Sequence, residues 1–148
     1  MSTNISLEFQ TKYDLALLSV GLKVRLVRLL VNVCFKTSTG WTKPYEAIVD
    51  TGNPTTVIPF NIHQQIFSQV LHPTKIDLLG LGQGSVRGRL SSVTMSFQDK
   101  QLTSPPFQAK AFLLDQNSTP LIIGYEDGLT ELRLVSDYPQ QTAYVEIP

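Results

Sequence analysis

Apolar and polar residues alternate with a period of two over most of the chain, a pattern typical of β-strands with one buried face. Turn residues separate the alternating segments, for example Thr39-Gly40 and Ser104-Pro105-Pro106. The alternation predicts strands over residues 22–35, 45–49, 93–97, 107–113 and 143–147. We therefore expect a mainly β fold.

The first of these segments changes phase after Arg28. Leu22, Val24 and Leu26 carry the apolar face before that point, and Leu29, Val31 and Val33 carry it afterwards. Such a switch predicts a β-bulge, or two strands that meet at a bend. A basic amphipathic helix is the competing interpretation, but the basic residues at 23, 25 and 28 do not gather on one helical face.

One segment has helical spacing instead. Apolar residues recur at positions 62, 66, 67 and 70, with Pro59 just ahead to start a helix and Asn61 as a candidate cap. A shorter helical turn is expected between residues 126 and 132, although Gly128 weakens it. The fold should therefore contain one or two short helices.

The length of 148 residues suits one domain over residues 1–148, with a core from about residue 22 and residues 1–21 as an N-terminal extension or extra strand. The single cysteine, Cys34, excludes an internal disulfide framework. One cysteine and two histidines give no reason to expect a metal site, and a net charge of zero gives none to expect a nucleic-acid partner. We find no export signal and no apolar stretch of spanning length, which predicts a cytoplasmic protein without a membrane partner.

The most informative string runs from residue 47 to residue 59, Ala-Ile-Val-Asp-Thr-Gly-Asn-Pro-Thr-Thr-Val-Ile-Pro. An apolar strand ends at Asp50, and Thr51 and Gly52 begin a turn before a second apolar strand. A packed strand can hold the Asp50 carboxyl at its end, while Gly52 lets another group approach the loop closely. Taken alone, Asp-Thr-Gly also fits an Asx-type turn between two strands.

Two further segments follow along the chain. Residues 79–90 read Leu-Gly-Leu-Gly-Gln-Gly-Ser-Val-Arg-Gly-Arg-Leu, and residues 121–124 read Leu-Ile-Ile-Gly. The first does not match a phosphate-binding loop, since Ser85 stands where the third glycine belongs. It fits a plain hairpin turn, and the second fits an ordinary buried strand. His63 is expected on an exposed face of the predicted helix. Arg87 and Arg89 are expected to lie in solvent, or to bind a carboxylate or phosphate of a substrate.

The order and spacing of all three segments resemble the retropepsin-like aspartic proteases, including the Ddi-type domains, over about residues 22–135. The resemblance implies a retropepsin-like closed β-barrel or sheet lobe with a flap hairpin. It implies that Asp50 is catalytic and that Thr51 and Gly52 form the active-site loop. It also implies a substrate-binding flap at Leu81, Gly82, Gln83, Gly84 and Ser85, and a supporting loop at Ile122, Ile123 and Gly124. In one departure, Gly128 stands where that family carries leucine, which puts the following helix in doubt.

Aspartic proteolysis needs two carboxylates around one water, and this chain has one Asp-Thr-Gly. We therefore expect a homodimer that joins two copies of Asp50, with the strand at residues 143–147 as a candidate for interface pairing. The expected function is an aspartic endopeptidase acting on extended peptides or unfolded proteins without a cofactor. The alternative is a non-catalytic dimerisation or peptide-binding module of the same fold. A more remote one is a β-barrel binding protein in which Asp-Thr-Gly is coincidental.

Overall fold

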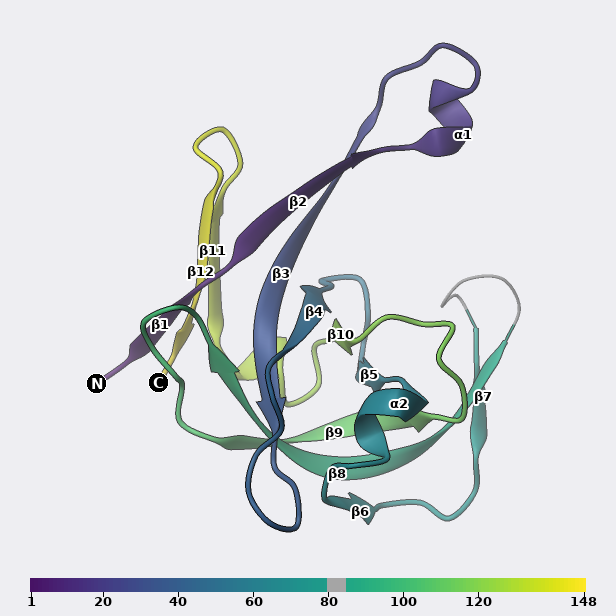
Figure 1. The fold of residues 1–148 in the computed structure, drawn as a ribbon, viewed down its shortest axis with the longest axis vertical. Helices are drawn as coiled ribbons and strands as arrows, with labels where there is room; N and C mark the ends of the chain where they lie inside the picture. The colour runs from purple at the N-terminus through teal and green to yellow at the C-terminus, as the bar shows by residue number, and fades with distance from the viewer. Residues whose placement is uncertain (80–84) are drawn as a thin grey trace.

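The computed structural model describes residues 1–79 and 85–148, and in this part the chain is mainly β (Figure 1). The strands are β1 (Thr3–Ser6), β2 (Glu8–Tyr13), β3 (Arg25–Phe35), β4 (Tyr45–Val49), β5 (Thr56–Ile58), β6 (Ser68–Val70), β7 (Ile76–Leu78), β8 (Val86–Gln98), β9 (Phe107–Leu114), β10 (Ile122–Ile123), β11 (Arg133–Asp137) and β12 (Thr142–Ile147). The helices are α1 (Leu15–Leu18), α2 (Phe60–His63) and a 3-10 turn, η1 (Leu129–Glu131).

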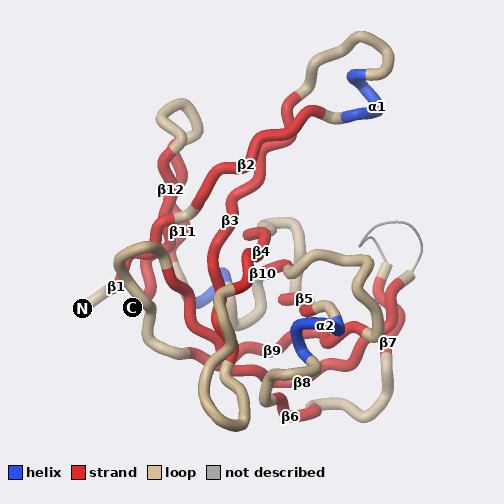
Figure 2. The backbone as a smooth tube through the Cα atoms, in the orientation of Figure 1, coloured by secondary structure: helices blue, strands red, loops and turns tan. Residues whose placement is uncertain are grey.

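The described strands form two sheets (Figure 2). A three-stranded sheet has the order β1-β12-β11, and a nine-stranded sheet has the order β2-β3-β4-β10-β5-β9-β8-β6, with β7 also on β8. β8 pairs in addition with β3, from Asn32↔Gln98 to Phe35↔Met95. The hydrogen-bonded path therefore leaves β3 through β4 and returns to it through β8.

One large hydrophobic core holds the two sheets together. The alternating residues predicted for β8, β9 and β12 point into it, among them Met95, Ala111 and Val145. Ile5 of β1 is also completely buried there, so the small sheet packs on the same core as the large one. The predicted strands at residues 45–49, 93–97, 107–113 and 143–147 are confirmed.

β3 corrects the expectation of a bulge or bend. It is one strand of 11 residues, and its register with β2 runs without a break from Glu8↔Leu30 to Tyr13↔Arg25. The phase switch has another cause, because Arg25–Arg28 are exposed on both faces while Leu29, Leu30 and Val31 are all buried. The strand passes from solvent into the core at Leu29.

The predicted helix over residues 62–70 is much shorter than expected. α2 ends at His63, and Ser68–Val70 form β6 on the edge of β8, with Gln69 opposite Ser92. Pro59, not Asn61, stands at the N-terminal cap. As a strand, residues 68–70 form backbone hydrogen bonds with the edge of β8. A helix that continued through these residues would leave that edge of β8 unpaired. The helical turn expected between residues 126 and 132 is present as η1.

β12 lies between β1 and β11, with Thr3 opposite Ile147 and Arg133 opposite Glu146. Both backbone edges of this strand are therefore used within the chain. The expected pairing of residues 143–147 with a partner chain is excluded in this arrangement, because neither edge is free. Among the described residues, no helix reaches the length and hydropathy needed to cross a bilayer.

Candidate active site

Asp50 directly follows β4, an interior strand of the large sheet held between β3 and β10. Its backbone N–H donates to the Ile123 carbonyl at 3.0 Å. Its carboxylate is partly exposed, and Oδ1 accepts a hydrogen bond of 2.9 Å from the Gly52 N–H. The second carboxylate oxygen has no hydrogen-bond partner in the described part of the chain. Asp50 therefore presents an acidic group from a rigid strand end.

The short strand β10 lies between the two strands that flank the Asp50 loop. Ile122 pairs in parallel with Ile48 of β4 and antiparallel with Val57 of β5. The connection from β4 to β5, residues 50–55, therefore crosses the end of β10. Segments that are about 70 residues apart in sequence meet at this point, since Ile123 lies beside Val49.

Residues 124–126 bind the underside of this loop through their backbone. The Tyr125 N–H donates to the Asn53 carbonyl at 3.0 Å, and the Glu126 N–H donates to the Pro54 carbonyl at 3.0 Å. Asn53 is buried, and its side-chain oxygen accepts from the Thr55 N–H at 3.2 Å. These contacts hold the loop from below, so that its outer face is the part left free.

Gly124 packs against the loop without room for a side chain. A Cβ atom at this position would stand 2.5 Å from the carbonyl carbon and oxygen of Thr55. The Gly124 N–H donates at 3.2 Å to Oγ1 of Thr56, which is fully buried. Asn53 was not singled out from the sequence, and Thr56 belonged to the quoted string without an assigned role. A polar Thr56 at the head of an apolar strand was the available signal.

Thr51 and Gly52 lie on the outer face of the loop and are exposed. The Thr51 hydroxyl makes no hydrogen bond to any described residue. A Cβ atom on Gly52 would stand 3.3 Å from Oδ1 of Asp50, so a side chain here would crowd the carboxylate. The structure thus leaves these two residues open to a neighbouring molecule.

The glycine-rich segment connects two paired strands. β7 and β8 are antiparallel, with Ile76 opposite Gly88 and Leu78 opposite Val86. Ser85 is exposed and precedes β8. The other predicted flap residues, Leu81, Gly82, Gln83 and Gly84, lie outside the described residues. The described strands establish a hairpin at this place in the chain.

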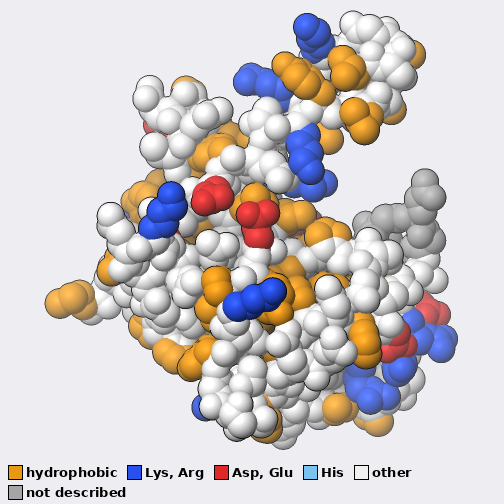
Figure 3. All heavy atoms as spheres, in the orientation of Figure 1, with side chains coloured by type: hydrophobic (Ala, Val, Ile, Leu, Met, Phe, Trp, Pro, Cys, Tyr) orange, Lys and Arg blue, Asp and Glu red, His pale blue; other side chains and the backbone are white. Residues whose placement is uncertain are grey.

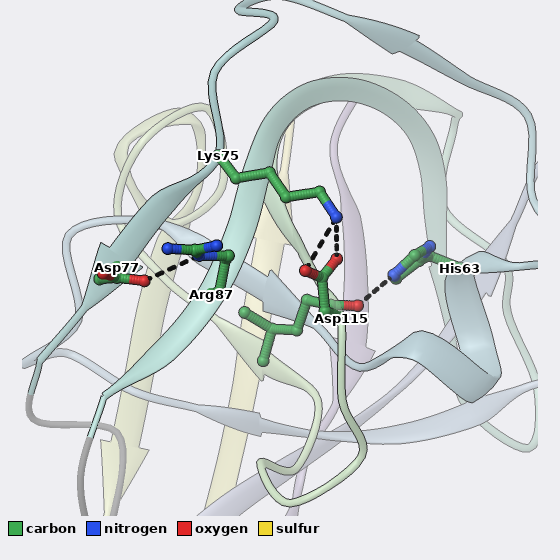
Figure 4. A network of polar contacts seen from close by, with 6 residues as sticks. His63, Lys75, Asp77, Arg87 and Asp115 are labelled. Atoms are coloured by element: carbon green, nitrogen blue, oxygen red, sulfur yellow. Dashed lines mark hydrogen bonds and ion pairs between the residues drawn. The ribbon is translucent and has the colours of Figure 1, made fainter.

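Polar contacts tie the base of this hairpin to β9 (Figure 4). Arg87 Nε donates to Asp77 Oδ1 at 3.1 Å across the β7–β8 pair, and Lys75 Nζ lies 2.9 Å from Asp115 Oδ2. The Asp115 N–H donates to the Arg87 carbonyl at 3.0 Å. Arg87 therefore has a carboxylate partner within the chain.

His63 lies on the other side of this network in Figure 4. Its Nε2 is 2.6 Å from the Leu114 carbonyl oxygen, and its ring stacks edge-on against Phe60. The expectation of an exposed His63 is wrong, because the ring is partly buried between α2 and the end of β9. It holds the helix to the sheet.

A cavity of about 270 Å³ opens between the Asp50 loop and the base of the hairpin. Its walls are largely apolar, with Pro54 from the loop, Val57 from β5, Leu78 and Leu79 from the hairpin and Phe112 from β9. It can accept an apolar side chain from a molecule that lies along the loop.

Other chemistries have little support among the described residues. No group of three histidine, cysteine, aspartate or glutamate side chains is arranged to hold a metal ion there. Cys34 is buried on β3, with Sγ 3.5 Å from Gln98 Oε1, and burial raises the pKa of its thiol. A raised pKa disfavours the thiolate that a nucleophile requires.

No protein-family model matches this chain, and no curated protein matches it significantly.

Proposed function

We propose that the protein is an aspartic endopeptidase of retropepsin-like fold, active as a homodimer. The observation that carries the proposal is the anchored Asp50 loop, with β10 inserted between β4 and β5 and Gly124 packed beneath it. The path of paired strands that returns from β8 to β3 supports a closed, barrel-like lobe. The hairpin of β7 and β8 beside the loop corresponds to the flap.

In the proposed dimer, two Asp50 carboxyl groups share one proton around a water molecule. The ionised one takes a proton from the attacking water, and the protonated one polarises the scissile carbonyl. Two adjacent carboxylates do not both ionise readily, because like charges at close range repel. The exposed outer face of the loop, with Thr51 and Gly52, is suited to meet the same face of a second copy.

The substrate would bind as an extended strand between the Asp50 loop and the hairpin, through main-chain hydrogen bonds. One of its side chains would enter the apolar cavity lined by Val57, Leu78 and Phe112. This favours extended peptides or unfolded proteins with apolar residues near the cleaved bond. The chemistry requires only carboxyl groups and water, so no cofactor is invoked.

The test is cleavage of an unstructured protein such as casein between about pH 3 and pH 7. Wild type is compared with Asp50→Asn, which keeps the size of the side chain and removes its acid. Asp137→Asn is the matched control, since Asp137 is exposed at the end of β11 in the three-stranded sheet. We expect cleavage by wild type and by Asp137→Asn, and only background with Asp50→Asn.

A non-catalytic module is the second candidate, and one contact favours it. Asp50 Oδ1 accepts from the Gly52 N–H, the hydrogen bond that an Asx turn uses for a purely structural purpose. A dimeric wild type that cleaves no substrate, and fails to bind peptides in which a hydroxyl replaces the scissile carbonyl, would support this candidate. Equal cleavage by wild type and Asp50→Asn would contradict the aspartic mechanism.

A further inference from the structure

Residues 10–28 form an arm that projects from the body of the molecule (Figure 1). The arm contains most of β2, the tip helix α1, a turn at Gly21 and the first four residues of β3. Within it β2 pairs only with β3, from Gln10↔Arg28 to Tyr13↔Arg25. A two-stranded ribbon without further packing is marginally stable in water. The arm therefore needs a covering surface.

The arm is apolar and exposed at the same time. Leu15 is 78% exposed, Val20 69% and Leu22 55%, and no residue of α1 is buried. Val24, just before β3, and Leu26 and Val27, on the two faces of its first residues, are also exposed. Figure 3 shows apolar side chains with basic ones between them on the arm, whose outer end stands clear of the body. Apolar surface that remains contiguous outside a core marks a contact site.

The charges of the arm and of the remaining chain are complementary. The arm carries four cations, Lys12, Lys23, Arg25 and Arg28, and one anion, Asp14, for a net charge of +3. The other residues carry eight cations and eleven anions, for a net charge of −3. The body of a second copy therefore has a net charge opposite in sign to that of the arm.

The register of the sheet fixes the direction in which the arm extends. β3 is antiparallel to β4, and Leu29 lies opposite Val49, the residue before Asp50. Residues 25–28 of β3 therefore continue past the end of β4, by about 13 Å at the usual rise per strand residue. The arm leaves the body on the side where the Asp50 loop turns.

We propose that the arm clasps the second protomer of a two-fold dimer, its apolar side chains and its cations covered by the partner. This inference rests on the proposed function in one respect, that the two Asp50 loops meet at the symmetry axis. The partner then occupies the space beyond the end of β4, into which the arm extends. Symmetry gives two such contacts for each dimer.

The test is the dimer dissociation constant, measured by sedimentation for wild type, Leu22→Asp, Arg25→Glu and Leu102→Asp. Leu102 is the matched control, because it is 48% exposed in the turn after β8 and receives the same substitution as Leu22. We expect both arm variants to raise the dissociation constant at least tenfold and Leu102→Asp to leave it unchanged. Raising the salt concentration should weaken the wild-type dimer, and Arg25→Glu should reduce that salt dependence. Arg25→Glu keeps the test decisive if Leu22→Asp does not fold.

Cleavage by the same proteins separates this inference from the proposed function. If wild type is an active dimer and both arm variants dimerise equally well, the proposed arm contact is wrong and the proposed protease activity is supported. If the arm variants dissociate but wild type cleaves nothing, the arm contact is supported and the proposed protease activity is contradicted. Flotation with phosphatidylserine vesicles tests whether the basic, apolar arm binds a membrane instead. Vesicle binding that Leu22→Asp abolishes, with dimerisation unchanged, would overturn the clasp in favour of a membrane contact.

Discussion

Gly124 lies so close to Thr55 that a Cβ atom on the glycine would stand 2.5 Å from the Thr55 carbonyl carbon and oxygen. Both obstructing atoms are backbone, so no side-chain rotation can relieve the overlap. Gly124→Ala must therefore move the Asp50 loop away from β10. We expect a loss of about 1–3 kcal/mol or more in the free energy of unfolding, measured by urea denaturation.

The matched control for this substitution is Gly40→Ala. A Cβ atom on Gly40 meets nothing within 4 Å. Its effect on stability should stay within about 0.5 kcal/mol. Equal stability of the two variants would contradict the close packing of Gly124 against the loop.

Thr56 offers a second test of the same contact. Its hydroxyl accepts the Gly124 N–H in a buried place, and Thr56→Val keeps the shape while removing the acceptor. An unpaired buried N–H costs about 1–3 kcal/mol, so the urea midpoint should fall accordingly. Thr56→Ser retains the hydroxyl and should recover part of that loss. A Thr56→Val protein as stable as wild type would show that the hydrogen bond contributes nothing.

Asp99 should make stability depend on pH in the acid range. Its carboxylate accepts the Ser6 N–H at 2.8 Å and the N–H groups of Gln101 and Leu102, each at 2.8 Å. These bonds, that of Ser6 first, lower the pKa of the Asp99 carboxyl below its ordinary value. A lowered folded-state pKa adds stability above the unfolded-state value of about 3.9, and this is lost as pH falls through the folded-state pKa.

The measurement is the free energy of unfolding from about pH 6 to pH 2 for wild type and Asp99→Asn. Wild type should be the more stable at pH 6, and the difference should shrink as the pH falls. Two curves that stay parallel over this range would show that Asp99 does not act through its ionised form.

The apolar cavity beside the Asp50 loop predicts a change in cleavage preference. Phe112 forms one wall of the cavity of about 270 Å³, and Phe112→Ala would enlarge it. If the protein is the protease proposed above, KM should fall for peptides with large aromatic side chains and rise for those with small aliphatic ones. Mass spectrometry of the products from a peptide mixture would show the shift. An unchanged product pattern would show that no substrate side chain binds in this cavity.

Strand periodicity predicted β3, β4, β9 and the second half of β8, because these segments bury alternating residues in a common core. Met95 and Phe97 on β8 and Ala109 and Ala111 on β9 show this directly. Helical periodicity was misleading at residues 62–70, where Phe67 and Val70 are exposed and share no buried face with Ile62. Edge pairing with β8 decided the structure there, and the local sequence carries no signal of it.

The site could be located only in part. The Asp-Thr-Gly string marks the loop, but periodicity does not bring residues 122–124 to it. Their place beside it was expected from a family resemblance, and the fold has Ile123 next to Val49. The contacts of Asn53 and Thr56 were missed because their partners, Tyr125 and Gly124, lie about 70 residues further along the chain. The exposed arm was missed since its alternation looks the same as that of a buried strand.

The pairing of Thr3 with Ile147 sets an order of events during synthesis. β1 leaves the ribosome well before β12, and it has no partner in its sheet until β12 has been made. Until then Ile5, the apolar residue of β1, must stay uncovered or be held by a chaperone. Contacts between such distant segments slow folding. The three-stranded sheet should therefore be the last part to form, and a chain that stalls before β12 should be a target for proteolysis.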